Sequence, residues 1–226
     1  MTVTARGGLR LTGVSKFFKG AVTVQALTSV TVAVEPGQSV GIVGSSGSGK
    51  STMLNILGLL DRPSDGTYEV DGVDTGSLTE SERTGLRAHA FGFVFQAFQL
   101  MESRDVLSNV ELGMMYRGIP AARRKTLSVQ ALERVGLSHR RHVRAGTLSG
   151  GEKQRAAIAR AVASSPGVLL CDEPTGNLDS ANAEAILSLL LDLQREGTTL
   201  VVVTHDPAVA GRMERRLHVK DGVVST

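Results

Sequence analysis

Aromatic residues and cysteine are scarce in this sequence of 226 residues, and tryptophan is absent. Because aromatics reach only 4% of the residues, aliphatic side chains and alanine must fill most of the core. The single cysteine, Cys171, excludes an internal disulfide and fits a reducing compartment. No uninterrupted apolar run approaches the roughly 18–20 residues that a membrane-spanning helix needs. We therefore expect any membrane role to come through a partner.

Excess charge of one sign is also missing, since 25 lysines and arginines face 22 acidic residues. The densest basic stretches, residues 123–125 and 139–144, are shorter than the stripes of nucleic-acid-wrapping proteins. We interpret them as solvated surface and not as a nucleic-acid footprint, so we expect no nucleic-acid partner. The first ten residues, MTVTARGGLR, lack the apolar segment of a signal peptide, so we expect a cytoplasmic location.

Strand and helix patterns follow one another in the order of an α/β fold. Alternating apolar segments in the first part predict a small antiparallel sheet, and later apolar strands without alternation predict a parallel sheet covered on both faces. Residues 97–165 show helical periodicity and no convincing strand, which predicts an inserted helical subdomain. The expected strands are residues 9–14, 27–34, 39–43, 67–73, 91–95, 168–171 and 199–204, and the expected helices begin at Lys50 and cover 181–195.

A glycine-rich loop follows the expected strand 39–43 and opens the expected helix at Lys50. It matches G-x-x-x-x-G-K-[ST], the phosphate-binding P-loop, in which backbone amides and the positive helix end surround phosphate oxygens. Lys50 would reach the β- and γ-phosphates of a nucleotide, and the Ser51 hydroxyl would coordinate Mg²⁺. The alternative, a flexible linker, does not need Lys-Ser at this offset. The candidate nucleotide-binding residues here are Gly44, Ser45, Ser46, Gly47, Ser48, Gly49, Lys50, Ser51 and Thr52.

A second polar cluster ends the apolar strand 168–171. Asp172 is placed to hold Mg²⁺, and Glu173 is placed to orient and polarise an attacking water as a general base. Open α/β sheets bind ligands outside the carboxyl ends of their strands, where the P-loop and this acidic pair would meet. Taken alone, Asp-Glu after an apolar run is an ordinary strand-to-turn boundary. The P-loop in the same chain favours the functional interpretation.

A Ser-Gly-Gly sequence between the P-loop and the acidic strand identifies a family. Leu148, Ser149, Gly150, Gly151 and Glu152 resemble the LSGGQ signature of ATP-binding-cassette (ABC) ATPases. Physically they form another helix start with a hydroxyl and bare amides, suited to phosphate. A capping serine before a Gly-Gly turn is the alternative. The resemblance implies that each ATP lies between the P-loop of one protomer and the signature of the other.

Further positions match the same family one by one. Gln96 resembles the Q-loop glutamine, which contacts Mg²⁺ and the helical subdomain. His205 resembles the switch histidine, which senses the γ-phosphate. Phe18 or Phe17 would stack on adenine, and Phe18 is favoured by its position. Leu178 and Asp179 resemble the D-loop, which crosses the dimer interface.

The resemblance extends over the whole chain. It implies one P-loop NTPase domain over residues 1–226, with a catalytic part at about 1–96 and 166–226 and a helical signature subdomain at about 97–165. Glu152 replaces the usual signature glutamine, as in the branch of macrolide exporters and lipoprotein-release ATPases. Phenylalanine replaces the commoner tyrosine at the adenine position.

The resemblance implies ATP hydrolysis with ATP and Mg²⁺ bound by Lys50, Ser51, Gln96 and Asp172. Glu173 and His205 would complete the catalytic set. Implied partners are a second copy of the chain and separately encoded membrane permease subunits, which would place the protein on the inner face of the cell membrane. A soluble non-transport ABC ATPase and a regulatory, division-type subunit stay open as alternatives. The substrate and the transport direction are not encoded in these motifs.

Overall fold

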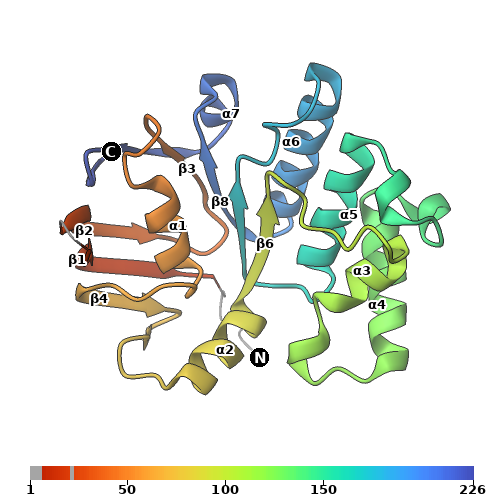
Figure 1. Ribbon diagram of the computed structural model, residues 1–226, viewed down its shortest axis with the longest axis horizontal. Helices are drawn as coiled ribbons and strands as arrows, with labels where there is room; N and C mark the ends of the chain where they lie inside the picture. Colours follow the sequence, from red (N-terminus) through yellow and green to blue (C-terminus); the bar gives the residue numbers. More distant parts are fainter. Residues whose placement is uncertain (1–6, 21–22) are drawn as a thin grey trace.

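A computed structural model describes residues 7–20 and 23–226, and shows two sheets with helices packed around them (Figure 1). Within that part of the chain, the strands are β1 Leu9–Phe18, β2 Val24–Val34, β3 Ser39–Val43, β4 Asp65–Val70, β5 Val73–Asp74, β6 Phe91–Phe95, β7 Val168–Asp172, β8 Thr199–Thr204, β9 Arg215–Lys220 and β10 Val223–Ser225. The α-helices there are α1 Lys50–Leu57, α2 Glu80–Ala90, α3 Val106–Leu112, α4 Ala121–Arg134, α5 Gly150–Val162, α6 Ser180–Arg195 and α7 Pro207–Gly211.

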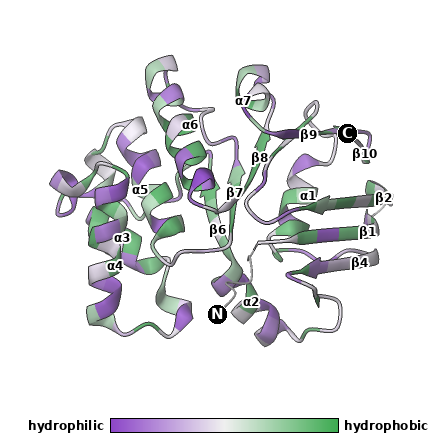
Figure 2. Ribbon diagram, turned by 180° about the vertical axis from the view of Figure 1, so that it is seen from behind, coloured by the Kyte–Doolittle hydropathy of each residue, from purple (hydrophilic) through white to green (hydrophobic). Residues whose placement is uncertain are grey.

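The larger sheet has the strand order β10-β9-β3-β8-β7-β6 and is parallel from β9 to β6. Alternate residues of one strand enter different hydrophobic clusters: Val168 and Leu170 face α1 and the smaller sheet, whereas Leu169 and Cys171 face the helices α3 to α6. Figure 2 shows the central strands β6, β7 and β8 coloured largely hydrophobic. The predicted parallel sheet with both faces covered is confirmed.

The smaller sheet, β2-β1-β4-β5, is antiparallel, as predicted. The single strand expected over residues 67–73 was wrong. A turn at Asp71 and Gly72, with φ of 49° and 79°, divides this segment into β4 and β5. The two strands then pair with each other, because the turn reverses the chain.

Residues 97–165 carry α3, α4 and α5, but they are not helical throughout. An extended loop separates β6 from α3, and the stretch between α4 and α5 contains only short 3₁₀ segments. A bridge between Asp105 and Arg144 ties these two connecting stretches together. The signature helix α5 begins at Gly150, because Ser149 is its N-cap.

Several elements were missed by the sequence patterns. Helix α2 carries a capping box, with Thr79 as its N-cap and Glu82 three residues later, which is a readable start signal. The hairpin of β9 and β10 turns at Asp221 and Gly222, both with positive φ, and Asp-Gly is a hairpin signal. In the described part of the chain, no helix is both long and apolar enough to cross a membrane.

Candidate nucleotide-binding site

A cleft of about 870 Å³ opens at the carboxyl ends of β3, β7 and β8. It brings together predicted residues from four separate stretches of the sequence. The first residues of α1 form one part of the lining, and side chains at or just after the ends of β6, β7 and β8 form another. The predicted residues lining the cleft are Ser46, Gly47, Gly49, Lys50, Ser51, Thr52, Gln96, Asp172, Glu173 and His205.

The P-loop, residues 44–51, depends on glycine where its backbone approaches neighbouring strands. A Cβ on Gly44 would lie 2.2 Å from the Val219 carbonyl oxygen, and one on Gly49 would lie 2.5 Å from that of Ala26. Gly49 also has φ of 113°, a conformation that L side chains rarely adopt. These contacts fix the curled backbone whose amides can surround an anion at the start of α1.

Lys50 folds back over the P-loop. Its Nζ donates hydrogen bonds to the carbonyl oxygens of Gly44 at 2.9 Å and Ser45 at 2.8 Å. The ammonium therefore lies over the loop that would hold phosphates. Gly44, Ser45 and Ser48 belong to this loop but do not line the cleft themselves.

The acidic pair lies at the carboxyl end of β7 and lines the cleft. Asp172 is half-buried, and its pKa is raised by burial and by the charge of Glu173, with Lys50 acting in the opposite direction. Glu173 adopts φ of 45°, and its backbone N–H donates to the Val203 carbonyl oxygen at 2.9 Å. Its carboxylate is thereby aimed at the neighbouring strand end, where His205 lies.

Glu173 and His205 form a direct pair. Glu173 Oε1 lies 2.6 Å from His205 Nδ1 and accepts the His205 backbone N–H at 3.1 Å. The hydrogen bond and the charge of Glu173 raise the pKa of His205 above its ordinary value. The Glu173 side chain is 16% exposed and the His205 side chain is 72% exposed. The histidine is thus open to a ligand in the cleft while it touches the carboxylate.

The donors in the cleft suit Mg²⁺ that arrives with phosphates. Ser51 offers a hydroxyl, Asp172 a carboxylate and Gln96 an amide oxygen, and all three line the cleft. Among the described residues, no cluster of three or more His, Cys, Asp or Glu side chains forms a metal site by itself. Such a sparse oxygen set is typical of Mg²⁺, which proteins bind through one or two carboxylates together with substrate phosphates.

Gln96, after β6, is joined to the segment that follows Glu173. Its Nε2 donates to Asn177 Oδ1 at 3.3 Å, and Asn177 Nδ2 donates to the Gln96 carbonyl oxygen at 2.9 Å. The sequence patterns did not predict this pairing, which joins residues 81 positions apart. Gln96 lines the cleft while its side chain points toward Asn177.

The signature, residues 148–152, lies outside the cleft. Ser149 caps α5: its hydroxyl accepts the Glu152 N–H at 3.3 Å, and the Glu152 carboxylate accepts the Ser149 N–H at 2.9 Å. Arg140 donates to the same carboxylate at 2.8 Å. Figure 1 shows α5 and α1 on opposite sides of the central strands. The signature of this chain is therefore remote from its own P-loop.

The predicted D-loop residues lie beside the signature. Asp179 is the N-cap of α6, accepting the Asn182 N–H at 3.0 Å. A Cβ on Gly150 would contact the Leu178 side chain at 3.4 Å. Leu178 and Asp179 do not line the cleft. Both helix starts, of α5 and α6, thus form one surface.

Phe17 and Phe18 end β1 and are not among the residues lining the cleft. Phe18 is 46% exposed, and Lys16 Nζ lies 5.1 Å from its ring centroid. Lys16 is itself fixed, because it donates to Asp61 Oδ1 at 2.6 Å. In the register of the sheet Phe18 pairs with Val24, which does line the cleft.

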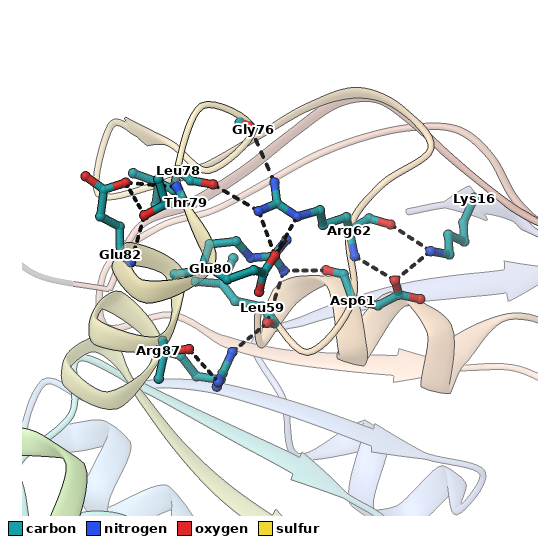
Figure 3. Close-up of polar contacts among 12 residues, drawn as sticks. Lys16, Leu59, Asp61, Arg62, Gly76, Leu78, Thr79, Glu80, Glu82 and Arg87 are labelled. Atoms are coloured by element: carbon teal, nitrogen blue, oxygen red, sulfur yellow. Dashed lines mark hydrogen bonds and ion pairs between the residues drawn. The ribbon is translucent and has the colours of Figure 1, made fainter.

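The far end of α1 is held by α2 (Figure 3). The Leu59 carbonyl oxygen accepts hydrogen bonds from Arg83 at 3.1 Å and from Arg87 at 2.9 Å, and Arg83 also donates to the Asp61 carbonyl oxygen at 3.0 Å. Cations are favourable at a helix carboxyl end. This network anchors the helix that carries Lys50 at its other end.

The sequence patterns missed one wall of the cleft. Two segments form it: the start of β2 and the turn between β9 and β10. The Gly222 N–H donates to the Ser48 carbonyl oxygen at 2.9 Å, so the turn is fixed to the P-loop. The Asp-Gly pair could have predicted this turn, but not its contact with the P-loop. The residues of this wall are Val24, Gln25, Ala26, Asp221 and Gly222.

Comparison with known proteins decides the family. The family model described as ABC transporter matches residues 27–176, a stretch that includes the P-loop, the signature and the acidic pair. The chain belongs to the ABC transporter family. It is an ABC ATPase, as its motifs predict, and the predicted resemblance is confirmed.

Two relatives show what this ABC ATPase is similar to. The macrolide export ATP-binding/permease protein MacB 1/2 of Paracoccus denitrificans (strain Pd 1222) is 44% identical over 223 residues, covering 98% of this chain and 33% of that protein. The uncharacterized ABC transporter ATP-binding protein YknY of Bacillus subtilis (strain 168) is 46% identical over 215 residues, covering 95% and 94%. The chain spans about a third of the MacB protein's length.

Solved ABC structures share the fold. The dimeric structure of MJ0796, a bacterial ABC transporter cassette, has a TM-score of 0.88 at 41% identity, covering 96% of this chain and 97% of that one. A dimeric post-hydrolysis state of MJ0796 bound to ADP and Pi has the same TM-score at 40% identity. The predicted fold class, an ABC-type P-loop NTPase, is confirmed.

Proposed function

We propose that this chain hydrolyses ATP in the cleft and energises a membrane transport or mechanotransmission complex by closing and reopening a dimer. The observation that carries the proposal is the meeting of the P-loop, Asp172, Glu173 and His205 in one cleft, with the signature on a separate surface. Each chain would thus contribute the P-loop half of one ATP site and the signature half of another. A second copy of the chain would complete each of them.

The residues of the cleft divide the chemistry among them. Lys50 leaves its carbonyl partners for the β- and γ-phosphates, and P-loop amides hold their oxygens. Ser51, Asp172 and Gln96 would hold Mg²⁺, which would neutralise charge on the phosphates. Glu173 accepts the proton of the attacking water, and His205, held at Glu173, contacts the γ-phosphate.

Dimer closure follows from where the signature lies. Ser149 and Gly150 are exposed and Gly151 is buried behind them; the helix start that these three residues form can bind the γ-phosphate held by the partner's P-loop, and Glu152 caps this start. A two-fold axis would form two equal sites at once. Residues 97–165 would act as the signature subdomain, which moves relative to the catalytic part at 1–96 and 166–226.

The membrane partner is proposed from the relatives. The MacB relatives are named ATP-binding/permease proteins, and YknY, of which this chain covers 94%, is named an ABC transporter ATP-binding protein. We place this chain at the cytoplasmic face of the membrane, bound peripherally to permease subunits encoded separately. The two alternatives are a soluble ABC ATPase and a regulatory subunit.

Copurification tests this proposal. The tagged chain, recovered from detergent-solubilised native membranes, should carry a multi-helix membrane protein, and the complex should hydrolyse ATP faster than the chain alone. A matched preparation of Lys50→Met should recover the same partner without turnover. Recovery of ribosomes or nucleic acid without a membrane protein would favour the soluble class, and a membrane complex without stimulated turnover would favour the regulatory one.

Adenine stacking distinguishes the two phenylalanines. Phe18→Ala should raise the Kd for ATP roughly tenfold, because stacking on a base contributes about 1–3 kcal/mol. Phe17→Ala, the adjacent matched change, should leave the Kd within about twofold, since neighbouring strand residues face opposite sides. Titration with a fluorescent ATP analogue measures both. The reverse ranking would assign the site to Phe17.

A further inference from the structure

A fully buried glutamine in α5 reaches the loop that begins at Glu173. Gln154 is 0% exposed, and its Nε2 donates to the Pro174 carbonyl oxygen at 2.6 Å. Its Oε1 is buried and has no hydrogen-bond partner among the residues that the structure describes. Burying an amide with one half unpaired costs free energy that an apolar side chain of similar size would avoid. Packing alone therefore does not explain a glutamine at this position.

The catalytic loop, residues 173–178, contains a strained backbone. Glu173 has φ of 45°, and a residue other than glycine occupies this region only when its surroundings hold it there. Two backbone hydrogen bonds of 3.1 Å close turns on the carbonyls of the loop's first and third residues. The carbonyl between them, that of Pro174, receives its hydrogen bond from Gln154. Helix α5 thus supplies a contact that the loop's own backbone does not.

Gln154 lies on the same helix as the signature. Gln154 lies one helical turn after Gly151, and the first turn of α5 is packed closely: a Cβ on Gly151 would lie 2.4 Å from Asn182 Oδ1. Close-packed elements move together and transmit displacement. A shift of the signature relative to β7 would therefore displace Pro174, the residue that follows Glu173.

We propose that Gln154 is a positioning residue that holds the Pro174 carbonyl, and through it Glu173, at a fixed place relative to the signature helix. This inference rests on the proposed function for its effect on turnover. In the proposed dimer, the signature binds the partner's ATP while Glu173 acts on the chain's own ATP. The Gln154 hydrogen bond is then a physical connection between the two sites.

Replacing the amide tests the effect on turnover. Gln154→Met keeps the length and removes the donor, and we expect kcat for ATP to fall about 10- to 100-fold, since a misplaced group of this kind costs up to about 10²-fold. The KM for ATP should stay within about twofold, because the P-loop is untouched. The matched control is Arg155→Met, which removes a donor on the same helix that bonds the Val135 carbonyl oxygen at 3.1 Å, away from the loop. It should leave kcat within about twofold.

A conservative variant adds a readout that a merely structural role would not change. In Gln154→Glu the protonated carboxyl can donate to Pro174, whereas the ionised form cannot. Burial raises the pKa of such a carboxyl, so its kcat relative to the parent should rise as the pH falls from about 8 to about 6. Arg155→Met should show no such trend.

Hydrogen exchange tests the positioning role of Gln154 without relying on ATP hydrolysis. The amides of Gly176 and Leu178, which close the turns of the loop, should exchange faster in Gln154→Met than in the parent or in Arg155→Met. Unchanged exchange with unchanged kcat in both Gln154 variants would overturn the positioning role, as would an equal loss in Arg155→Met. If the parent does not hydrolyse ATP, the proposed function fails, and the exchange comparison still decides whether Gln154 holds the loop.

Discussion

Glu173→Gln is expected to lower kcat for ATP hydrolysis by about 10²–10⁴-fold, the usual contribution of a general base. The amide has the shape of the carboxylate but cannot accept a proton from water. ATP binding should persist within about twofold, because Lys50, Ser51 and the P-loop amides are unchanged. The variant should therefore accumulate an ATP-bound dimer, which the parent protein forms only transiently before hydrolysis.

The structure provides the reason to expect such a large effect from this one carboxylate. Glu173 is held by its backbone hydrogen bond to Val203 and by its contact with His205. Another carboxylate could therefore take its position only if the end of the strand moved. Asp172 points into the same cleft, but the proposed role in holding Mg²⁺ occupies it. Of the other two carboxylates that line the cleft, Asp172 has the proposed Mg²⁺ role, and Asp221 belongs to the turn between β9 and β10, on the wall shared with the start of β2.

Single-turnover kinetics with radiolabelled ATP and gel filtration with ATP measure the two halves of this prediction. The matched control is Glu184→Gln, the same chemical change on the exposed face of α6, where the carboxylate bonds Arg212 at 2.9 Å. That variant should keep kcat within about twofold. Turnover of Glu173→Gln within about tenfold of the parent would remove Glu173 from the base role.

The sequence predicted the strands that end at functional motifs. Strands β3, β6 and β8 have the expected limits, because each is a short apolar run that stops at a polar motif. The P-loop position was predictable for the same reason, since glycine, lysine and serine are required at fixed offsets from the strand. Local patterns suffice where backbone geometry is dictated within a few residues.

Elements held by distant contacts were not predictable in this way. Helix α2 lacks an apolar stripe, and its buried residue is Arg83, which bonds carbonyls at the end of α1. Strand β9 lies in the sheet because it pairs with β3, far earlier in the chain. The Gln96–Asn177 pairing and the contact of Gln154 with Pro174 likewise join separate segments. Their residue types are visible in the sequence, but their partners are set by the packed fold.

A mixture of two inactive variants should regain ATP hydrolysis. Lys50→Met disables the P-loop and leaves the signature intact. Ser149→Asp leaves the P-loop intact and puts a negative charge where the partner's γ-phosphate would bind, while aspartate still caps α5. Each variant alone should lose about 10²–10³-fold in kcat through lost stabilisation of phosphate charge. Mixed one to one, they should recover up to about a quarter of the parent rate, since half of the dimers are mixed and each holds one intact site of two.

This recovery depends on the separation of α1 and α5 within one chain. If a P-loop used the signature of its own chain, every chain in the mixture would carry a defect, and the rate would be the average of the two inactive preparations. Placing both changes in one chain and mixing it with the parent gives the control, because such mixed dimers contain no intact site. Mixing Lys50→Met with the parent should therefore leave more activity than mixing the double variant with it.

Obligatory coupling between the two sites could suppress turnover in a dimer with a single intact site. ATP retention separates that case from a missing composite site, because trapping does not require hydrolysis. With Glu173→Gln added to every chain, the Lys50→Met and Ser149→Asp mixture should retain one ATP in each mixed dimer. Retention no greater than that of the separate variants would contradict a site shared between protomers, and the signature surface formed by the starts of α5 and α6 would then need another ligand.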